Sequence, residues 1–199
     1  MCSRFKSVTD ANRMAQFFKA AMPDGVRADI WPTYESAYIV ADGAGSRRVQ
    51  LGQFGLLPHW AKDSTFGRHT YNARSETVAE RPSFRDAWLR GQRCIIPAEA
   101  IYEPQWQGGK AQSTAIARAD GYPMGIAGLW SQWQDKLSFT MLTVNADDHV
   151  FMRHFHKPQD EKRMVVILPM GAYRDWLNPA TDAQAFMLQY PAERLQVQV

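Results

Sequence analysis

The 199-residue chain has the length of one domain, and its 45% of hydrophobic residues suffices for a single core. A net charge of +3 permits binding to a polyanion but lacks the dense basic field that binders of long duplexes usually carry. The chain has neither a membrane-spanning apolar run nor the apolar core of a signal peptide, so we expect a cytoplasmic protein without a membrane partner.

In chain order, the pattern predicts many strands and few helices. Thr9 or Asp10 can cap a first helix that should end at residues 23–25. A polar stretch without clear period occupies residues 58–80, and loops of that kind are usually functional or disordered. Short helices are expected at 82–89, 169–178 and 181–188. Strands are expected at 36–42, 47–57, 93–98, 100–106, 112–118, 123–133, 137–146, 163–168 and 194–199.

These elements define the expected fold class. Strands that rarely alternate with helices disfavour a parallel, doubly wound sheet. We therefore expect an α+β fold with a strongly curved, mostly antiparallel and barrel-like sheet flanked by short helices. It should form a single domain over residues 1–199.

Cys2 is the first candidate for chemistry because of its position. Removal of Met1 would leave an amine and a thiol on adjacent carbons. The α-amino group titrates near 7.7–8.0, and a neighbouring cation such as Arg4 should lower the pKa of the thiol. Such an aminothiol can condense with an aldehyde and close a five-membered ring, which no internal cysteine can do. On position alone, an ordinary chain terminus is the commoner explanation.

Other polar residues stand out less sharply. Asn72 can donate and accept hydrogen bonds and Arg74 offers a planar fork for phosphate, although NARSET could equally be a turn with a helix cap. Glu103 lies among apolar and aromatic neighbours, where a raised pKa would suit proton transfer, or it is an ordinary surface strand residue. Cys94, within the apolar segment RCIIPA, should be a buried hydrophobic residue without a chemical role.

Three histidines precede the apolar segment RMVVIL: His149, His154 and His156. No cysteine or carboxylate at recognisable spacing supports a metal site, so we expect no metal. Acid–base chemistry or a phosphate contact is more plausible than metal binding, while for any single histidine a solvated or packing role is commonest.

Five segments occur in order along the chain: MCSRF, FGLLPHW, YNARSET, the segment around Glu103, and the histidine stretch before RMVVIL. In this combination the sequence resembles the SOS response-associated peptidase family, whose members attach covalently to abasic DNA. The resemblance extends over nearly the whole chain.

The resemblance implies a role for each matching residue. Cys2 would be the nucleophile and form a thiazolidine with the ring-opened sugar. Asn72 would hold the reacting amine or the sugar, and Glu103 would move protons. His156, chosen over His154, would assist ring opening or contact the adjacent phosphate.

The resemblance also implies a surface that binds DNA. Arg4 and Arg74 would contact the backbone, and Trp60 would stack against or wedge the bases. Trp31, in a DIWPT segment that replaces the usual Asn and Ala-Pro, would offer a further stacking surface. Other departures are Ser3 in place of the usual glycine, an intervening KPQDEK before Arg163, and the absence of a basic C-terminal region.

The function thus expected is covalent capture of abasic sites in single-stranded DNA, which protects the lesion during the DNA damage response. An abasic-site lyase side activity is implied, no cofactor is required, and we expect a monomer that joins the nucleoid when bound to DNA. One alternative is a cysteine peptidase or autoprocessing enzyme with Cys2 as nucleophile and His156 as base. Another is a non-covalent single-stranded DNA-binding protein with its tryptophans as stacking platforms.

Overall fold

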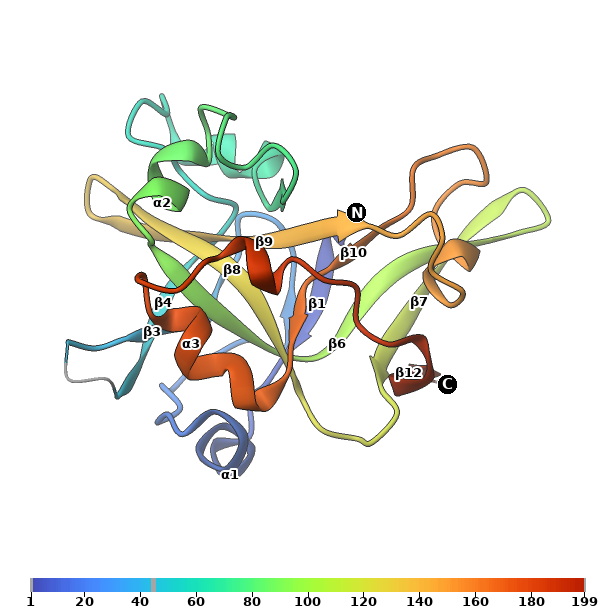
Figure 1. Cartoon of the computed structure of the whole chain (residues 1–199), viewed down its shortest axis with the longest axis horizontal. Helices are drawn as coiled ribbons and strands as arrows, with labels where there is room; N and C mark the ends of the chain where they lie inside the picture. The colour runs from blue at the N-terminus through green and yellow to red at the C-terminus, as the bar shows by residue number, and fades with distance from the viewer. Residues whose placement is uncertain (1, 44–45, 199) are drawn as a thin grey trace.

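The computed structural model describes residues 2–43 and 46–198, and its centre is a closed five-stranded barrel (Figure 1). Around the barrel, each strand is hydrogen-bonded to the next, and the last returns to the first. Of these pairings, β4 with β9 is parallel and the others are antiparallel. The expected α+β fold with a curved, mostly antiparallel sheet is confirmed. The barrel strands are, in order of contact, β3 (Glu35–Ala41), β4 (Arg47–Phe54), β9 (Lys136–Asn145), β8 (Met124–Trp133) and β6 (Arg93–Gln107).

Shorter strands extend the sheet beyond the barrel. β1 pairs with β6 and with β2, β7 pairs with β6, and β12 pairs with β7. β5 and β10 pair with β9, and β11 pairs with β8. Their bounds are β1 (Arg4–Ser7), β2 (Asp29–Ile30), β5 (Asn72–Arg74), β7 (Lys110–Arg118), β10 (Arg163–Val165), β11 (Ile167–Leu168) and β12 (Leu195–Gln198).

Helices are few and short. α1 (Ala11–Arg13) starts after Asp10, whose side chain accepts a hydrogen bond from the Arg13 amide, and continues as a π-helical turn at Met14–Phe18. The other α-helices are α2 (Arg85–Leu89) and α3 (Tyr173–Leu177), and 3-10 turns lie at Ser64–His69, Met152–His154, Met170–Ala172, Gln184–Phe186 and Ala192–Arg194. In the part of the chain that the structure describes, no helix is long and apolar enough to cross a bilayer.

The boundaries differ from expectation at several places. The first helix ends at Phe18 instead of near residue 23, because Lys19 turns into the left-handed region at φ 55°. The helix expected at 181–188 is reduced to one 3-10 turn. The final strand was expected at 194–199; residue 199 lies outside the described residues.

The largest difference between the expected and the observed strands is at β6. The segments 93–98 and 100–106 are one 15-residue strand, which exchanges one set of neighbours for another along its length. Its first half pairs with β8, including Pro97 opposite Gly125, and its second half lies between β1 and β7. Because β6 passes from the barrel wall into the outer sheet, it carries the residues of the candidate site away from the core.

Candidate active site at the N-terminal strand

Strand β1 fixes the position of Cys2 against the outer half of β6. Arg4 lies opposite Tyr102, and Phe5 is fully buried with its ring edge-on to Phe54 at 5.3 Å. Cys2 itself is 1% exposed, and its Sγ donates a hydrogen bond to the Arg4 carbonyl at 3.2 Å. The strand pairing thus holds the second residue of the chain in a buried position.

Asn72, on β5, reaches Cys2 from a different part of the sheet. β5 pairs in parallel with β9, with Asn72 opposite Met141, and this short ladder fixes the direction of the side chain. The Asn72 Nδ2 donates to the Cys2 carbonyl at 2.6 Å. Within residues 2–43 and 46–198, the Asn72 Oδ1 is buried and has no hydrogen-bond partner. A buried acceptor without a partner is costly, so a ligand that donates a hydrogen bond to the Asn72 Oδ1 would be bound favourably here.

Glu103 and His156 form a buried pair beside Cys2. Glu103 is 1% exposed and His156 is 7% exposed, and the Glu103 Oε2 lies 2.8 Å from the His156 Nε2. The His156 amide donates to the Pro104 carbonyl at 2.7 Å, which ties the histidine loop to β6. Of the atoms described, the His156 Nδ1 is also buried without a hydrogen-bond partner.

The three histidines occupy different environments. His154 is exposed to solvent, whereas His156 is the histidine that contacts Glu103. His149 is buried, with its Nε2 at 2.7 Å from the Tyr190 carbonyl and its Nδ1 accepting from the Met152 amide. These contacts give His149 a structural role. Among the described residues, no three His, Cys, Asp or Glu side chains are grouped to hold a metal ion.

The electrostatics of Cys2 correct the expectation that Arg4 lowers its pKa. In the full-length chain, burial and then the negative charge of Glu103 raise the pKa of the thiol to about 12. The Arg4 guanidinium contacts Asp29, and Arg4 approaches the thiol through its backbone carbonyl. The thiol therefore stays protonated at neutral pH.

Tyr71 is a site residue that the sequence reasoning missed. Burial, followed by the charges of Cys2 and Glu103, raises the pKa of its phenol. Its ring packs edge-on against Phe54 at 5.8 Å. Its place directly before the NAR segment was the available signal.

Arg4 and Trp31, both expected to bind DNA, lie together at the edge of the site. The Arg4 guanidinium is 4.1 Å from the Tyr102 ring centroid and 5.1 Å from that of Trp31. Its Nε donates to Asp29 at 2.7 Å, and the Trp31 Nε1 donates to the same carboxylate at 3.1 Å. Trp31 is 42% exposed. Asp29, which sequence reasoning did not single out, therefore neutralises Arg4 and orders an exposed aromatic surface.

Arg74 and Trp60 lie on two different pockets. Arg74 is half exposed, pairs with Glu161 at 2.8 Å, and shares with His156 a pocket of about 430 Å³. Trp60 lines a separate pocket of about 300 Å³ with Lys62 and is stabilised by an edge-on Phe66 ring at 5.0 Å. The structure thus brings Arg74 next to the Glu103–His156 pair and places Trp60 at another surface.

Comparisons with known proteins identify relatives of this chain. The abasic site processing protein YoaM of Bacillus subtilis is 31% identical, over 98% of this chain and 86% of its own. The abasic site processing protein HMCES of Gallus gallus is 26% identical, over 79% of this chain and 54% of its own.

Two solved structures and one family model complete the comparison. A protein from Bordetella bronchiseptica superposes with a TM-score of 0.91 at 45% identity, over 98% of both chains. A protein from Bacteroides thetaiotaomicron, at 21% identity, shares the fold with a TM-score of 0.82 over 98% of this chain and 90% of its own. The model of the family described as SOS response associated peptidase (SRAP) matches residues 1–199. This chain therefore belongs to the SOS response associated peptidase family.

Proposed function

We propose that this protein processes abasic sites in DNA by capturing them covalently. Removal of Met1 would free the Cys2 amine, which with the thiol condenses with the aldehyde of a ring-opened abasic sugar in single-stranded DNA. The observation that carries the proposal is the convergence of Asn72, Glu103 and His156 on Cys2 from three separate segments. The names of the relatives, which are abasic site processing proteins, support the substrate class.

The first step opens the sugar. An abasic deoxyribose is mostly a closed hemiacetal, and opening requires a proton to leave its hydroxyl and another to reach the ring oxygen. The Glu103–His156 pair can exchange a proton across its 2.8 Å contact, and the His156 Nδ1 is free of protein partners among the described residues. This pair therefore suits the bifunctional proton transfer that opening needs.

The amine reacts before the thiol. It forms a C–N bond to the aldehyde carbon, and the carbinolamine loses water to give an imine. The Cys2 sulfur then adds to the imine carbon to form the C–S bond, and the proton of the thiol passes to the nitrogen. The balance is one aldehyde plus one aminothiol giving one thiazolidine and one water. An imine that undergoes β-elimination instead would cut the strand, and this would give the protein a lyase side activity.

The same geometry disfavours a cysteine peptidase. That chemistry needs a thiolate activated by a nearby histidine. Here burial and Glu103 raise the pKa of the Cys2 thiol, and the Sγ donates to the Arg4 carbonyl. His156 is bonded to Glu103. We therefore do not advance a peptidase function.

The proposed DNA path runs along the edge of the site. Arg74 would exchange its Glu161 partner for a backbone phosphate next to the lesion. Arg4, already neutralised by Asp29, would act with Trp31 as a stacking surface for a flanking base. Trp60 would contact a more distant base.

The test is a denaturing gel with mass spectrometry, using single-stranded oligonucleotides with and without one abasic site. The expected adduct survives denaturation, requires the abasic site, and has the summed mass less one water. Cys2→Ala should abolish it, and a protein whose Cys2 amine is acetylated should fail equally. An adduct that persists with a blocked amine would overturn the thiazolidine, and no adduct from protein lacking Met1 would overturn covalent capture.

A further inference from the structure

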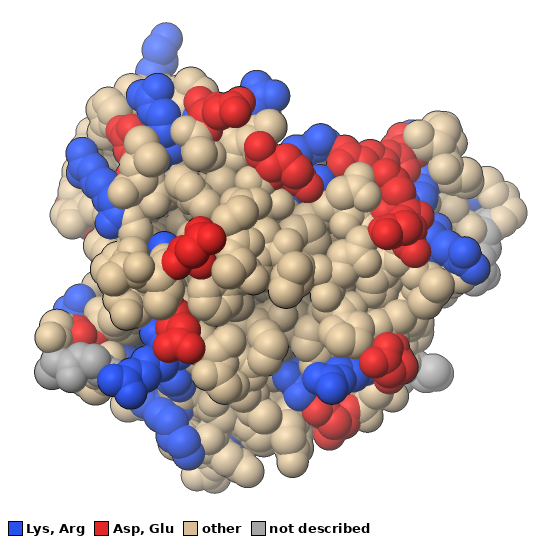
Figure 2. Space-filling view, viewed as in Figure 1, with Lys and Arg blue, Asp and Glu red and all other residues tan. Residues whose placement is uncertain are grey.

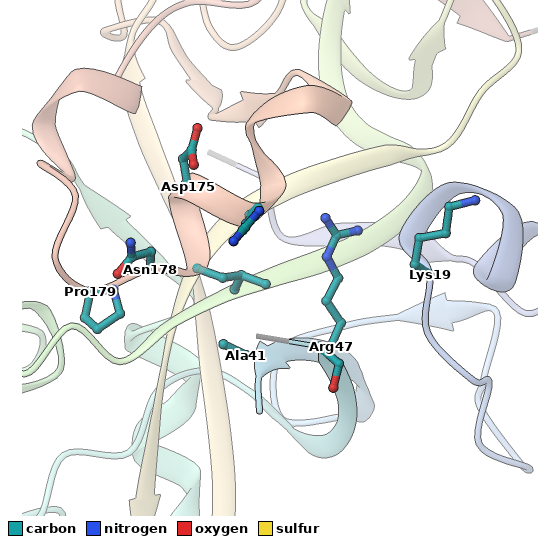
Figure 3. A pocket seen from close by; sticks show the side chains of 9 residues that line it. Lys19, Ala41, Arg47, Asp175, Asn178 and Pro179 are labelled. Carbon is teal, nitrogen blue, oxygen red and sulfur yellow. The ribbon is translucent and has the colours of Figure 1, made fainter. Parts of the chain in front are cut away.

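A second pocket, of about 490 Å³, lies between the β3–β4 hairpin, the end of the first helix and α3 (Figure 3). The Arg47 side chain points into it, with Lys19 on one side and the segment carrying Asp175 and Asn178 on the other. Figure 2 shows basic side chains gathered over this part of the molecule. The lining includes Lys19, Arg47, Arg174, Asp175, Leu177 and Asn178.

Arg47 is the central side chain of this pocket. One of its N–H groups donates to the Phe18 carbonyl at 2.8 Å, and its guanidinium lies 5.3 Å from the Tyr173 ring centroid. Partial burial lowers the pKa of Arg47, but an arginine remains protonated at any physiological pH. No described carboxylate forms an ion pair with it.

Arg47 differs from comparable arginines because, among the described residues, it has neither a carboxylate partner nor more than the one hydrogen bond to the Phe18 carbonyl. Arg93, which is more deeply buried, donates to the carbonyls of Trp176, Asn178 and Thr181. The others have carboxylate partners: Arg13 with Glu99, Arg118 with Asp120, and Arg163 with Glu76 and Glu161. A partly desolvated cation without a counter-charge is costly, so a bound anion would stabilise it.

The rest of the lining favours an anion with several oxygens. Lys19 and Arg174 add two exposed cations, neither of them in an ion pair within the described parts of the chain, and Asp175 contributes one negative charge. The guanidinium fork matches the oxygens of phosphate, and Asn178 can donate a further hydrogen bond. We propose that this pocket is a binding site for a phosphate group, carried by a free phosphate or by a nucleic-acid backbone.

The pocket lies far from Cys2. Arg93, at the start of β6, donates to the Asn178 carbonyl beside the pocket, whereas Glu103 lies ten residues further along the same strand. At about 3.3 Å per residue, this strand length is up to roughly 33 Å. The phosphate site is therefore independent of the proposed reaction at Cys2, and Arg47 variants should still form the abasic adduct.

The experiment is calorimetric titration with inorganic phosphate at constant ionic strength. Wild type and Arg48→Gln, a neighbouring exposed arginine, should bind phosphate equally. Arg47→Gln should bind at least tenfold more weakly, and Arg174→Gln should also weaken binding. Asp175→Asn should tighten it severalfold, because it removes the one carboxylate of the lining. Arg174 and Asp175 are exposed, so these two variants decide the question even if Arg47→Gln does not fold.

The outcomes separate the possible sources of the phosphate. Competition by an intact oligonucleotide that depends on Arg47 would assign the site to a nucleic-acid backbone. Phosphate binding without such competition would assign it to a free phosphate group. The proposal is overturned if phosphate acts no differently from chloride, or if Arg48→Gln weakens binding as much as Arg174→Gln and Asp175→Asn does not tighten it.

Discussion

His156 adopts a backbone conformation that few side chains tolerate, with φ at 63°. Left-handed residues other than glycine, asparagine and aspartate are strained by roughly 1–2 kcal/mol. Strain of this kind is retained where the surrounding structure imposes it, and here the hydrogen bond to the Pro104 carbonyl and the pair with Glu103 do so.

Two substitutions separate this strain from the chemistry. His156→Asn should be more stable than His156→Ala by about 1 kcal/mol, because asparagine tolerates the left-handed region. Both should slow abasic capture by about a hundredfold, the scale of one acid–base group. Urea unfolding and single-turnover gels measure the two effects. His154→Ala, at an exposed position, should change neither, and equal stability of the two His156 variants would contradict the strain argument.

The sequence identified part of the site and missed another part for physical reasons. Asn72, Glu103 and His156 match a family pattern, and the structure places Asn72 and Glu103 beside Cys2 and His156 against Glu103. Asp29 acts through a contact with Arg4, a residue distant in sequence, which no spacing reveals, whereas Tyr71 was overlooked although it directly precedes the NAR segment. The pKa of the Cys2 thiol is raised by burial and by Glu103, neither of which can be seen in the sequence near Cys2. The nearby Arg4 therefore led to the wrong expectation that this pKa is lowered.

At the scale of elements, an ion-pair network ties the end of β5 to β10. Arg163 is 3% exposed at its side chain and pairs with Glu76 and Glu161, while Glu161 also pairs with Arg74. Burial alone would raise the pKa of Glu76, but the hydrogen bond and charge of Arg163 together with backbone hydrogen bonds outweigh burial and lower that pKa. The network holds β5, and therefore Asn72, near the histidine loop.

Glu76→Gln should consequently destabilise the protein in a pH-dependent way. A lowered pKa stabilises the fold above the unfolded value of 4.5, and this stabilisation is lost as the pH falls through the folded value. We expect a loss of about 1 kcal/mol at pH 7, limited by the exposure of Glu76, and a markedly smaller loss at a pH below the lowered pKa of Glu76. Urea unfolding at both pH values measures it, with exposed Glu80→Gln as control. A loss that does not change with pH would argue against the ion pair.

Gly55, directly after β4, lets the backbone of the 3-10 turn Ser64–His69 approach closely at Gly67. Its φ is 119°, and a Cβ there would lie 2.1 Å from the Gly67 carbonyl oxygen. Gly55→Ala should therefore cost at least about 2 kcal/mol of unfolding free energy. Gly171→Ala, where a Cβ meets no atom within 4 Å, is the matched control. Thermal unfolding compares the two variants. Similar melting temperatures would show that the backbones at Gly55 and Gly67 can move apart at little cost in free energy.

Element types were easier to predict than element boundaries. Apolar alternation marked β3, β4, β8 and β9, whose ladders lie in the barrel wall. β1, β2 and β5 were missed because four, two and three residues are too short to show a period. The expected strands 93–98 and 100–106 left out only Glu99 between them, and the structure joins them into one strand that also accommodates Pro97 and Pro104 in its ladders.

At the scale of the whole molecule, the net charge of +3 limits non-covalent affinity for DNA. Near the site, carboxylates already pair with Arg4, Arg74 and Arg163, which leaves few cations free to displace counterions. We expect Cys2→Ala to bind single-stranded DNA with a log–log salt slope no steeper than about −2, corresponding to roughly three phosphates. Fluorescence anisotropy across a salt series measures the slope. A markedly steeper slope would reveal a larger basic surface than the one described.

The placement of β1 sets an order of events during synthesis. Its partners in β6 are Ala98 to Tyr102, so β1 cannot complete its ladder until about a hundred residues have been made. At about 5–20 residues per second, the N-terminus waits some 5–20 s as open chain. Cys2 becomes almost wholly inaccessible once the ladder forms. On the proposed function, this interval is when an aminopeptidase would reach Met1 most readily, because the Cys2 that follows it is not yet held by the ladder.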